Sequence, residues 1–319
     1  VHGLVELHGS NYYSTISNAF RGIYSINGGI VKLEKGVVDF NNCKKGIEFG
    51  NYPNYSSASI IKLCNFKWDD NLKSESGYPE YAINVWGGLD GLQVEWISVE
   101  NQQNNSFNDD RRGIGVLLHG CGATIKSGFG LTLFKDLYAG VRVNAPVGAN
   151  SNQLLIESCF FEGNTYGVKA DNKPNMLVKW NSFTKDRFYS GPIASVFANS
   201  CQDLVAESNG ISWDGGTAFE DILGFWLVDC QNPQILSNTL TDNPIASRYS
   251  YMGIYLDGGN GNAEWKCNTF DIMHMFTPSC DVNINGTSLI DQGNPTVSTG
   301  NKYNANPLNA NNFRVVAST

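Results

Sequence analysis

The sequence GVRV at residues 140–143 returns as GVKA at 167–170, SVFA at 195–198, GFWL at 224–227 and GIYL at 253–256. The third residues of these motifs are separated by 27, 28, 29 and 29 positions; they are Arg142, Lys169, Phe197, Trp226 and Tyr255. A period this regular is too short for a separate domain and indicates a structural repeat.

A second motif confirms the repeat: each unit also carries an apolar strand, then a small or polar residue, then a large apolar residue, at 156–161, 178–183, 206–211, 235–240 and 265–270. One unit alone would leave an apolar face in water, so successive units must stack. The pattern therefore predicts an all-β fold, a right-handed parallel β-helix of about ten coils. It forms a single domain over residues 1–319. Asn181, Asn209, Asn238 and Asn268 occupy one position of this motif, and we expect them to stack as a ladder at a bend.

Composition agrees with this fold and excludes several functions. A chain of 319 residues with 34 Gly and only 16% charged residues shows no sustained helical period, and short alternating runs are bounded by Gly, Asn, Asp and Ser. A net charge of −8 with scattered basic residues argues against a nucleic-acid partner. No apolar stretch reaches the ~20 residues that would predict membrane insertion. The segment 1–7 has no features of a signal peptide and reads as part of a strand, which suggests a piece of a longer chain.

The eight Cys form no Cys-x-x-Cys pair, which argues against a zinc knuckle or a thioredoxin-type site. Cys201 and Cys230 occupy equivalent places in successive units. Stacking at ~4.8 Å suits either a disulfide or two stacked free thiols, and both interpretations stay open.

The runs at 36–49 (GVVDFNNCKKGIEF), 64–66 (CNF) and 111–116 (RRGIGV) resemble the repeat region of large secreted bacterial β-helix proteins. In that family the region is commonly followed by a C-terminal type IX secretion sorting domain. The resemblance implies an extracellular or cell-surface location, and it specifies fold and export better than function.

Because Val141 and Val143 are expected to point inward, Arg142 points outward, and the alternation extends to every unit. The outward column then contains Glu48, Asn84, Gly115, Arg142, Lys169, Phe197, Trp226, Tyr255 and Asn283. Its three consecutive aromatics predict an exposed stripe on which a sugar ring can pack, with Arg142 and Lys169 binding hydroxyls. The alternative is that the aromatics only stabilise the sheet or lie beneath another domain.

Acidic residues follow the second strands and could hold Ca²⁺ between units, a possible cofactor: Asp69, Glu100, Asp136, Glu162, Asp186, Asp214, Asp242 and Asp271. The candidate calcium ligands are Asp69, Asp109 and Asp110. Most such residues are ordinary solvated turn formers, and otherwise no cofactor is expected.

Enzymes with this fold are chiefly polysaccharide lyases and glycoside hydrolases, and the best catalytic cluster in the sequence is Lys185, Asp186 and Arg187. The Asn-Thr-Asp, Gly-His-Gly and Arg-x-Lys motifs of pectin-cleaving hydrolases do not occur. His119 and His274 read as structural. The longest insertions, 69–81 and 100–112, lie on neighbouring units, where such folds often carry binding groups.

These observations predict an adhesive or carbohydrate-binding scaffold without catalysis. Its partners would be a polysaccharide or surface glycan and other domains of the same chain. The alternatives are a polysaccharide lyase or glycoside hydrolase acting on a surface groove, and a purely structural stalk.

Overall fold

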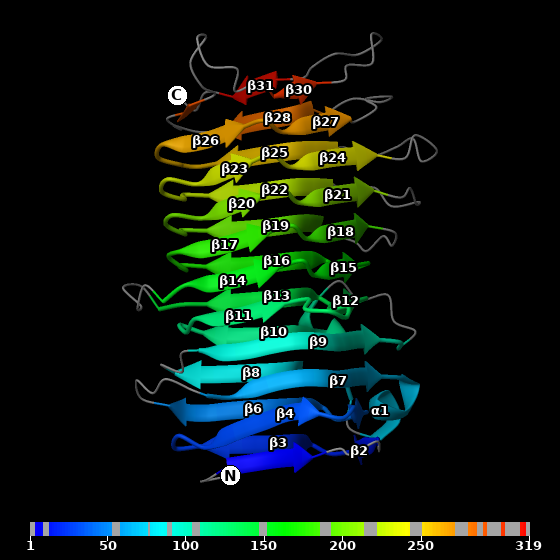
Figure 1. Ribbon diagram of the computed structural model, residues 1–319. Coiled ribbons are helices and arrows are strands. Elements are labelled where there is room, and N and C mark those ends of the chain that lie inside the picture. The colour runs from blue at the N-terminus through cyan, green and yellow to red at the C-terminus, as the bar shows by residue number, and fades with distance from the viewer. Residues whose placement is uncertain are drawn as a thin grey trace.

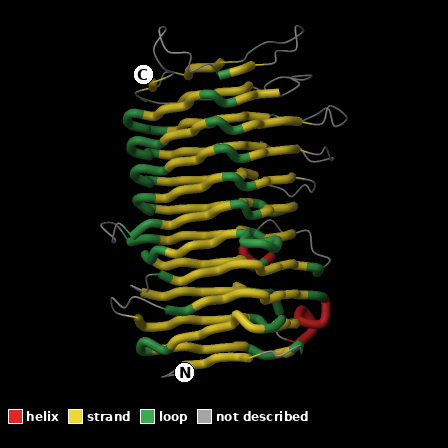
Figure 2. The backbone as a smooth tube through the Cα atoms, viewed as in Figure 1, coloured by secondary structure: helices red, strands yellow, loops and turns green. Residues whose placement is uncertain are grey.

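The computed structural model describes residues 4–8, 13–52, 58–75, 77–87, 91–103, 109–146, 152–185, 193–213, 222–242, 251–271, 280–285, 290–291, 301–303 and 313–316. In these residues the chain forms a parallel β-helix, with coils stacked from the N-terminus at the bottom of Figure 1 to the C-terminus at the top. The all-β prediction is confirmed. Short turns separate the strands of each coil (Figure 2).

One wall of the solenoid is an 11-stranded parallel sheet, the B sheet. Its strands are β3 (Arg21–Ile26), β6 (Lys45–Tyr52), β8 (Tyr81–Gly87), β10 (Ile114–His119), β13 (Ala139–Asn144), β16 (Tyr166–Asp171), β19 (Ile193–Asn199), β22 (Ile222–Val228), β25 (Tyr251–Asp257), β28 (Cys280–Asn285) and β31 (Phe313–Val316). The described coils therefore number eleven on this wall, where the sequence predicted about ten.

The remaining strands form a 20-stranded parallel sheet, the A sheet, which bends along its length into two halves. The first half contains β1 (Leu4–His8), β4 (Ile30–Lys35), β11 (Ala123–Lys126), β14 (Leu154–Glu157), β17 (Met176–Lys179), β20 (Val205–Glu207), β23 (Gln234–Leu236), β26 (Ala263–Lys266) and β29 (Ile290–Asp291). The second half contains β2 (Ser14–Ser17), β5 (Val38–Asn41), β12 (Leu133–Lys135), β15 (Phe160–Glu162), β18 (Ser182–Lys185), β21 (Gly210–Trp213), β24 (Thr239–Asp242), β27 (Thr269–Asp271) and β30 (Lys302–Tyr303). Two longer strands run through both halves: β7 (Ile60–Trp68) and β9 (Leu92–Asn101).

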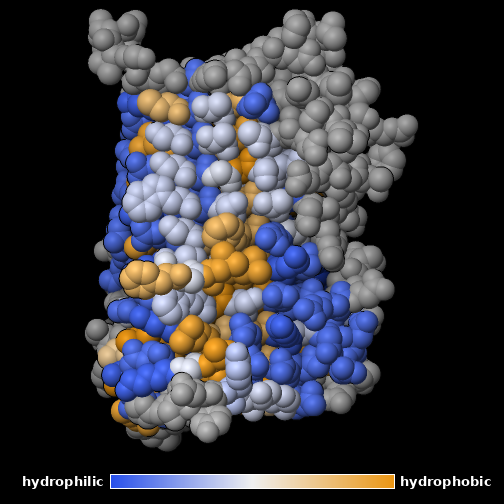
Figure 3. Space-filling model, turned by 45° about the vertical axis from the view of Figure 1, so that its right-hand side comes forward, coloured by the Kyte–Doolittle hydropathy of each residue, from blue (hydrophilic) through white to orange (hydrophobic). Residues whose placement is uncertain are grey.

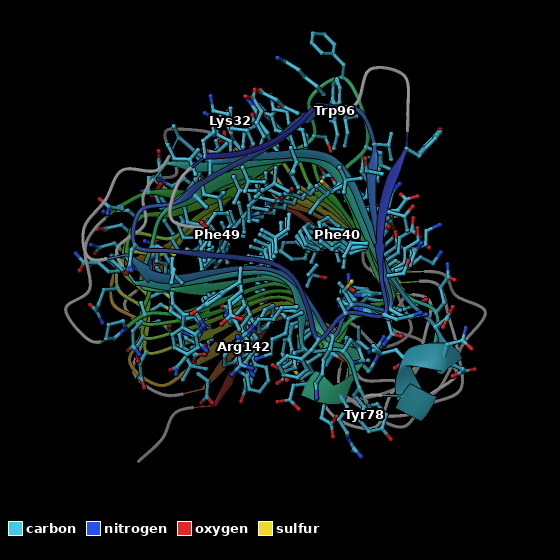
Figure 4. All side chains as sticks on the ribbon, turned by 90° about the horizontal axis from the view of Figure 1, so that it is seen from below. Lys32, Phe40, Phe49, Tyr78, Trp96 and Arg142 are labelled. Atoms are coloured by element: carbon cyan, nitrogen blue, oxygen red, sulfur yellow. The ribbon has the colours of Figure 1, made fainter. Side chains whose placement is uncertain are left out.

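The core is built by stacking equivalent residues of successive coils. Val141, Val168 and Val196 are in register on neighbouring B-sheet strands, and all three are fully buried. Aromatic rings of the A sheet stack in the same way, with centroids 5.2 Å apart for Phe134 and Phe161 and 4.7 Å for Phe161 and Phe183. The interior is therefore a set of side-chain columns that run along the axis, as the labelled Phe40 and Phe49 show in Figure 4.

The repeated glycine of the B sheet has a steric cause. A Cβ placed on Gly140 would lie 2.5 Å from the Phe161 ring, and one on Gly167 would lie 2.5 Å from the Phe183 ring. Such distances are not tolerated in a close-packed core. The glycine of one motif is thus required by the large apolar residue of the other, which explains why the two repeat together.

From β14 onward, the bend between the two halves of the A sheet is made by one non-glycine residue in the left-handed region. These residues are Ser158, Trp180, Ser208, Ser237 and Cys267, with φ between 54° and 57°. This conformation costs about 1 kcal/mol or more per residue, so neighbouring interactions must hold it.

The asparagine ladder that follows the bend supplies those interactions. The Nδ2 of Asn181 donates to Oδ1 of Asn209 at 3.0 Å, and this pattern continues through Asn238 and Asn268 to Asn301. Each Nδ2 also donates to a main-chain carbonyl of the preceding coil, such as Ile156 for Asn181. The predicted ladder is confirmed and extends one step beyond the predicted residues.

Cys201 and Cys230 are buried free thiols on successive coils, which resolves the two alternatives in favour of stacked thiols. The adjacent Cys230 sulfur and burial raise the pKa of Cys201. The thiol of Cys201 is therefore protonated at neutral pH.

Among the described residues, two short helices interrupt the coils: α1 (Asp70–Glu75) and the 3-10 helix η1 (Asp110–Arg112). Both belong to the predicted insertions 69–81 and 100–112. No helix in the part of the chain that the structure describes has the length and apolar character needed to span a membrane. The face shown in Figure 3 mixes hydrophilic side chains with side chains of intermediate hydropathy, and hydrophobic side chains gather along its middle.

Candidate functional site

The outer face of the B sheet carries one outward side chain per coil at equivalent positions, which we call the outer row. Strand register assigns it these residues: Tyr24, Glu48, Asn84, Leu117, Arg142, Lys169, Phe197, Trp226 and Tyr255. The prediction of Gly115 in this row is wrong, because Val116 pairs with Val141 and Leu117 with Arg142. Gly115 instead faces the Phe134 ring, as Gly140 faces Phe161 and Gly167 faces Phe183. The pairing partner of Tyr255 on β28 is Asn283, whose side chain lies outside the described set.

The three aromatics of the row are in contact, in the predicted order. Ring centroids of Phe197 and Trp226 are 4.8 Å apart at 79°, and those of Trp226 and Tyr255 are 6.1 Å apart at 34°. They are half-buried rather than fully exposed as predicted, because they pack on a parallel column formed by Ala194, Leu223 and Met252. The packing fixes the rings and leaves only part of each available to a ligand.

Aromatic and neutral groups surround the two cations of the row. Lys169 Nζ donates to Tyr138 Oη at 2.9 Å and lies 4.7 Å from the Tyr166 ring centroid. Arg142 Nε donates to Asn144 Oδ1 at 3.3 Å, with its guanidinium 5.9 Å from the Tyr138 ring. Among the described residues neither cation forms an ion pair. Cation–π contacts orient a positive charge without neutralising it, so both charges remain able to attract an anion.

Next to Arg142, toward the N-terminus, the same face is hollowed into a cavity of about 580 Å³. We call it the end cavity. The two insertions form its wall with Tyr78, Pro79 and Arg111, and Figure 4 shows Tyr78 beside the Arg142 face of the solenoid. B-sheet strands contribute Trp86, Ile114, Leu117 and Arg142. Its volume lies in the range of small-molecule sites, and seven of its fourteen lining residues are charged while the others are mainly aromatic or apolar.

Most carboxylates at the end cavity are held by basic partners. Glu48 Oε2 lies 2.6 Å from Arg21 Nε, and Glu80 lies between Lys45 at 3.0 Å and Lys44 at 3.6 Å. Arg111 pairs with Asp109, which lowers the pKa of that carboxyl. The carboxylate charge is therefore largely satisfied within the protein.

A stacked pair borders the cavity. The rings of Trp86 and His119 are 3.6 Å apart and nearly parallel, at 7°. Burial, and then the Arg142 charge, lowers the pKa of His119. Burial also raises the pKa of the Tyr81 phenol in the cavity. At neutral pH both side chains are uncharged, so Arg142 is the charged group of this cluster.

The predicted catalytic cluster is not supported by the position of Lys185. This residue is 3% exposed, and its ammonium donates to the carbonyls of Asn164, Thr165 and Ala194 at 2.5, 3.3 and 3.2 Å. It faces inward because it lies two residues after the buried Phe183 on β18. Lys185 thus ties coils together. Asp186 and Arg187 lie outside the described residues.

The predicted calcium ligands have other partners. Asp69 Oδ1 accepts hydrogen bonds from Asn42 and from the main chain of Asn71, and Asp109 caps η1 and binds Arg111. Asp110 lines the end cavity and does not belong to the predicted row of acidic residues that follows the second strands. Along that row, Glu100, Lys135 and Glu162 alternate in register. The described residues contain no group of three or more His, Cys, Asp and Glu side chains that could hold a metal ion.

Sequence reasoning pointed to the two insertions, which contain Tyr78 and Arg111, but did not predict that they form one cavity with Trp86. Trp86 carried a usable signal: it lies two residues after Asn84 on β8, and period-2 alternation places it on the same outer face.

A family model described as "Right handed beta helix region" matches residues 95–301. The chain belongs to the right-handed β-helix family. The match establishes the predicted handedness, and the matched region contains the whole row from Leu117 to Tyr255.

No curated protein matches the chain. Among solved structures, the right-handed β-helix described here has a distant likeness to the periplasmic alginate epimerase AlgG. The identity is 10% and the TM-score 0.26, over 91% of this chain and 77% of that one.

Proposed function

We propose that this right-handed β-helix is an extracellular or cell-surface module that binds polysaccharide along the outer face of the B sheet without acting on it chemically. The observation that carries the proposal is the row Arg142, Lys169, Phe197, Trp226 and Tyr255. It sets two cations without carboxylate partners among the described residues beside three contacting rings.

The repeat of the row suits an extended glycan. Neighbouring strands lie about 4.8 Å apart, a spacing close to the length of one pyranose unit in an extended chain. Each coil can therefore present one side chain to one sugar. The C–H face of a sugar packs on an aromatic ring, while its hydroxyls bind Arg or Lys donors.

The outer location rests on the resemblance of the repeats to secreted bacterial β-helix proteins, including export through type IX secretion. Under this proposal the domain is one piece of a longer surface protein, and its scaffold presents the row to a surface glycan. Calcium is not needed for the proposed contacts.

Binding is tested on a glycan array, followed by titration of the best polysaccharide against the wild type and Trp226→Ala. The variant is expected to bind at least about tenfold more weakly, because a central aromatic anchor is removed. Trp180→Ala is the matched control, since Trp180 is 55% exposed at the bend between β17 and β18 of the other sheet. Circular dichroism checks that both variants are folded.

The same polysaccharides are assayed for unsaturated products and new reducing ends. Turnover would replace the binding proposal with a polysaccharide lyase or glycoside hydrolase. Absence of both binding and turnover across the array would leave the structural stalk.

A further inference from the structure

We propose that the end cavity seats one sugar unit that carries a carboxylate, with Arg142 binding the carboxylate and Trp86 and Tyr78 packing on the ring. This inference rests on the proposed function and deepens it. It identifies the ligand as an acidic polysaccharide and gives the place where one of its sugar units binds.

Position supports the proposal first. Arg142 lines the end cavity and is also the first cation of the row that continues through Lys169 to Tyr255. A glycan that follows the row therefore reaches the cavity without leaving the face. The insertions wall the cavity on one side, so a unit seated there is surrounded more closely than units farther along the row.

Shape and surface support it next. Trp86 is 47% exposed although it is a large aromatic, and its stacking on His119 holds the ring in one orientation. Tyr78 lines the same cavity from the insertion, with the Arg111 guanidinium 5.8 Å from its ring. Rigid rings around a cavity of about 580 Å³ fit a pyranose unit with room for bound water.

Charge identifies the substituent. Four Lys or Arg side chains line the cavity against three carboxylates, and Glu48 and Glu80 are both engaged in ion pairs. Arg142 is the lining cation held only by Asn144 and an aromatic ring among the described residues. A guanidinium binds a carboxylate through two parallel hydrogen bonds. Arg142 carries one positive charge beside an uncharged His119, and this charge is balanced by a ligand group with one negative charge, such as a carboxylate.

The test uses fragments of polygalacturonic acid and the same fragments after their carboxyls have been reduced to alcohols, titrated by calorimetry. The wild type is expected to bind the acidic fragments about tenfold or more tightly than the reduced ones. Arg142→Gln should lose most of this preference, and the remainder comes from Lys169. Lys179→Gln, a loss of the same charge on the other sheet, should keep the wild-type preference.

Trp86→Ala is the second variant, and it should weaken both fragment types together because it removes the ring platform and leaves Arg142. Thermal unfolding confirms that each variant is folded.

The outcomes separate the two proposals. Wild-type binding without preference for the acidic form, or a preference that survives undiminished in Arg142→Gln, overturns the cavity proposal and leaves glycan binding by the row intact. Failure of the wild type to bind either fragment type or any glycan of the array overturns both. Loss of preference in Arg142→Gln alone supports the cavity.

Discussion

The two sheets of the solenoid present very different outer faces although both are built by the same stacking. On the A sheet, Lys62, Glu95, Lys126, Glu157 and Lys179 occupy one column in register, so the charge alternates from coil to coil. Glu95 pairs with Lys62 at 2.9 Å and with Lys126 at 3.3 Å, and Glu157 pairs with Lys179 at 3.3 Å. On the B sheet, the equivalent row holds Arg142 and Lys169 beside aromatic rings.

The difference shows that a column of outward side chains in a parallel sheet can either neutralise its own charges or leave them available to a ligand. Where opposite charges alternate, each side chain is satisfied by its neighbours, and the face stabilises the stack while offering little to a ligand. Where cations lie beside rings, the stack contributes orientation and leaves the charge for an external partner. The A face is therefore a structural surface, and the B face is the surface on which we place binding.

The largest effect should come from reversing a charge on the B face. Lys169→Glu replaces the cation bound to Tyr138 with a carboxylate, so an acidic polysaccharide should bind about 30-fold more weakly, or worse. Calorimetric titration with polygalacturonate fragments measures the change. Lys126→Glu, the same reversal on the A face, should leave affinity unchanged; a similar loss there would remove the distinction between the faces.

Reversing the central charge of the A face should affect stability and leave binding intact. Glu95→Lys breaks two ion pairs and places three lysines in adjacent positions, which should lower the free energy of unfolding by about 2 kcal/mol. Urea denaturation measures this loss, and unchanged glycan affinity serves as the control.

Acid should weaken the same contacts. Burial tends to raise the pKa of Glu95, but Lys62 and Lys126 outweigh it and lower the pKa. The contribution of Glu95 is therefore complete above the ordinary Glu pKa and is lost as pH falls through its lowered folded value. Glu95→Gln should show a smaller loss of stability on acidification, and an unchanged acid profile would contradict this account.

A smaller effect should appear in the titration of His119. Burial and the nearby Arg142 lower the pKa of this imidazole. The neutral form is favoured in the folded state, so its contribution to stability is complete above the ordinary His pKa of about 6.5 and declines as pH falls below it. Arg142→Gln should raise the His119 pKa, as followed by NMR. A titration identical to that of the wild type would show that the Arg142 charge does not reach the Trp86 and His119 stack.

The smallest effect is expected for one outer pair of the A face. Lys179→Gln removes a partly exposed ion pair with Glu157 and should change the free energy of unfolding by no more than about 0.5 kcal/mol. A change well above this in urea denaturation would mean that the alternating column acts cooperatively.

Most of the fold could be predicted from the sequence because a parallel β-helix repeats its contacts at a fixed period. Asn181 to Asn268 could be placed in a ladder from their spacing, since each lies at the same place in its unit. The register failed at Gly115 because glycines at 113 and 115 fit the motif equally well. Only packing against Phe134 distinguishes them, and the periodic pattern does not contain that contact.

The site was less predictable, for two physical reasons. Trp226 was expected to be exposed, and its burial depends on a neighbouring column that includes Leu223, which is visible only once the strands are aligned. The end cavity depends on insertions that break the period, so the period could not predict that Tyr78 and Trp86 line the same cavity. Lys185 was different, because its alternation with Phe183 already placed it inside.

The stacking of coils along a single axis also determines how the domain would respond to force. Its N-terminus and C-terminus lie at opposite ends of the stack in Figure 1. Tension applied between them pulls each terminal coil directly away from its neighbour, opening its row of hydrogen bonds in sequence. A detached coil of 24 to 36 residues, the range of spacings between equivalent positions, would lengthen the chain by on the order of 100 Å. Stretching a single molecule should therefore give a series of separate extensions of comparable length, so that the stack opens gradually under load.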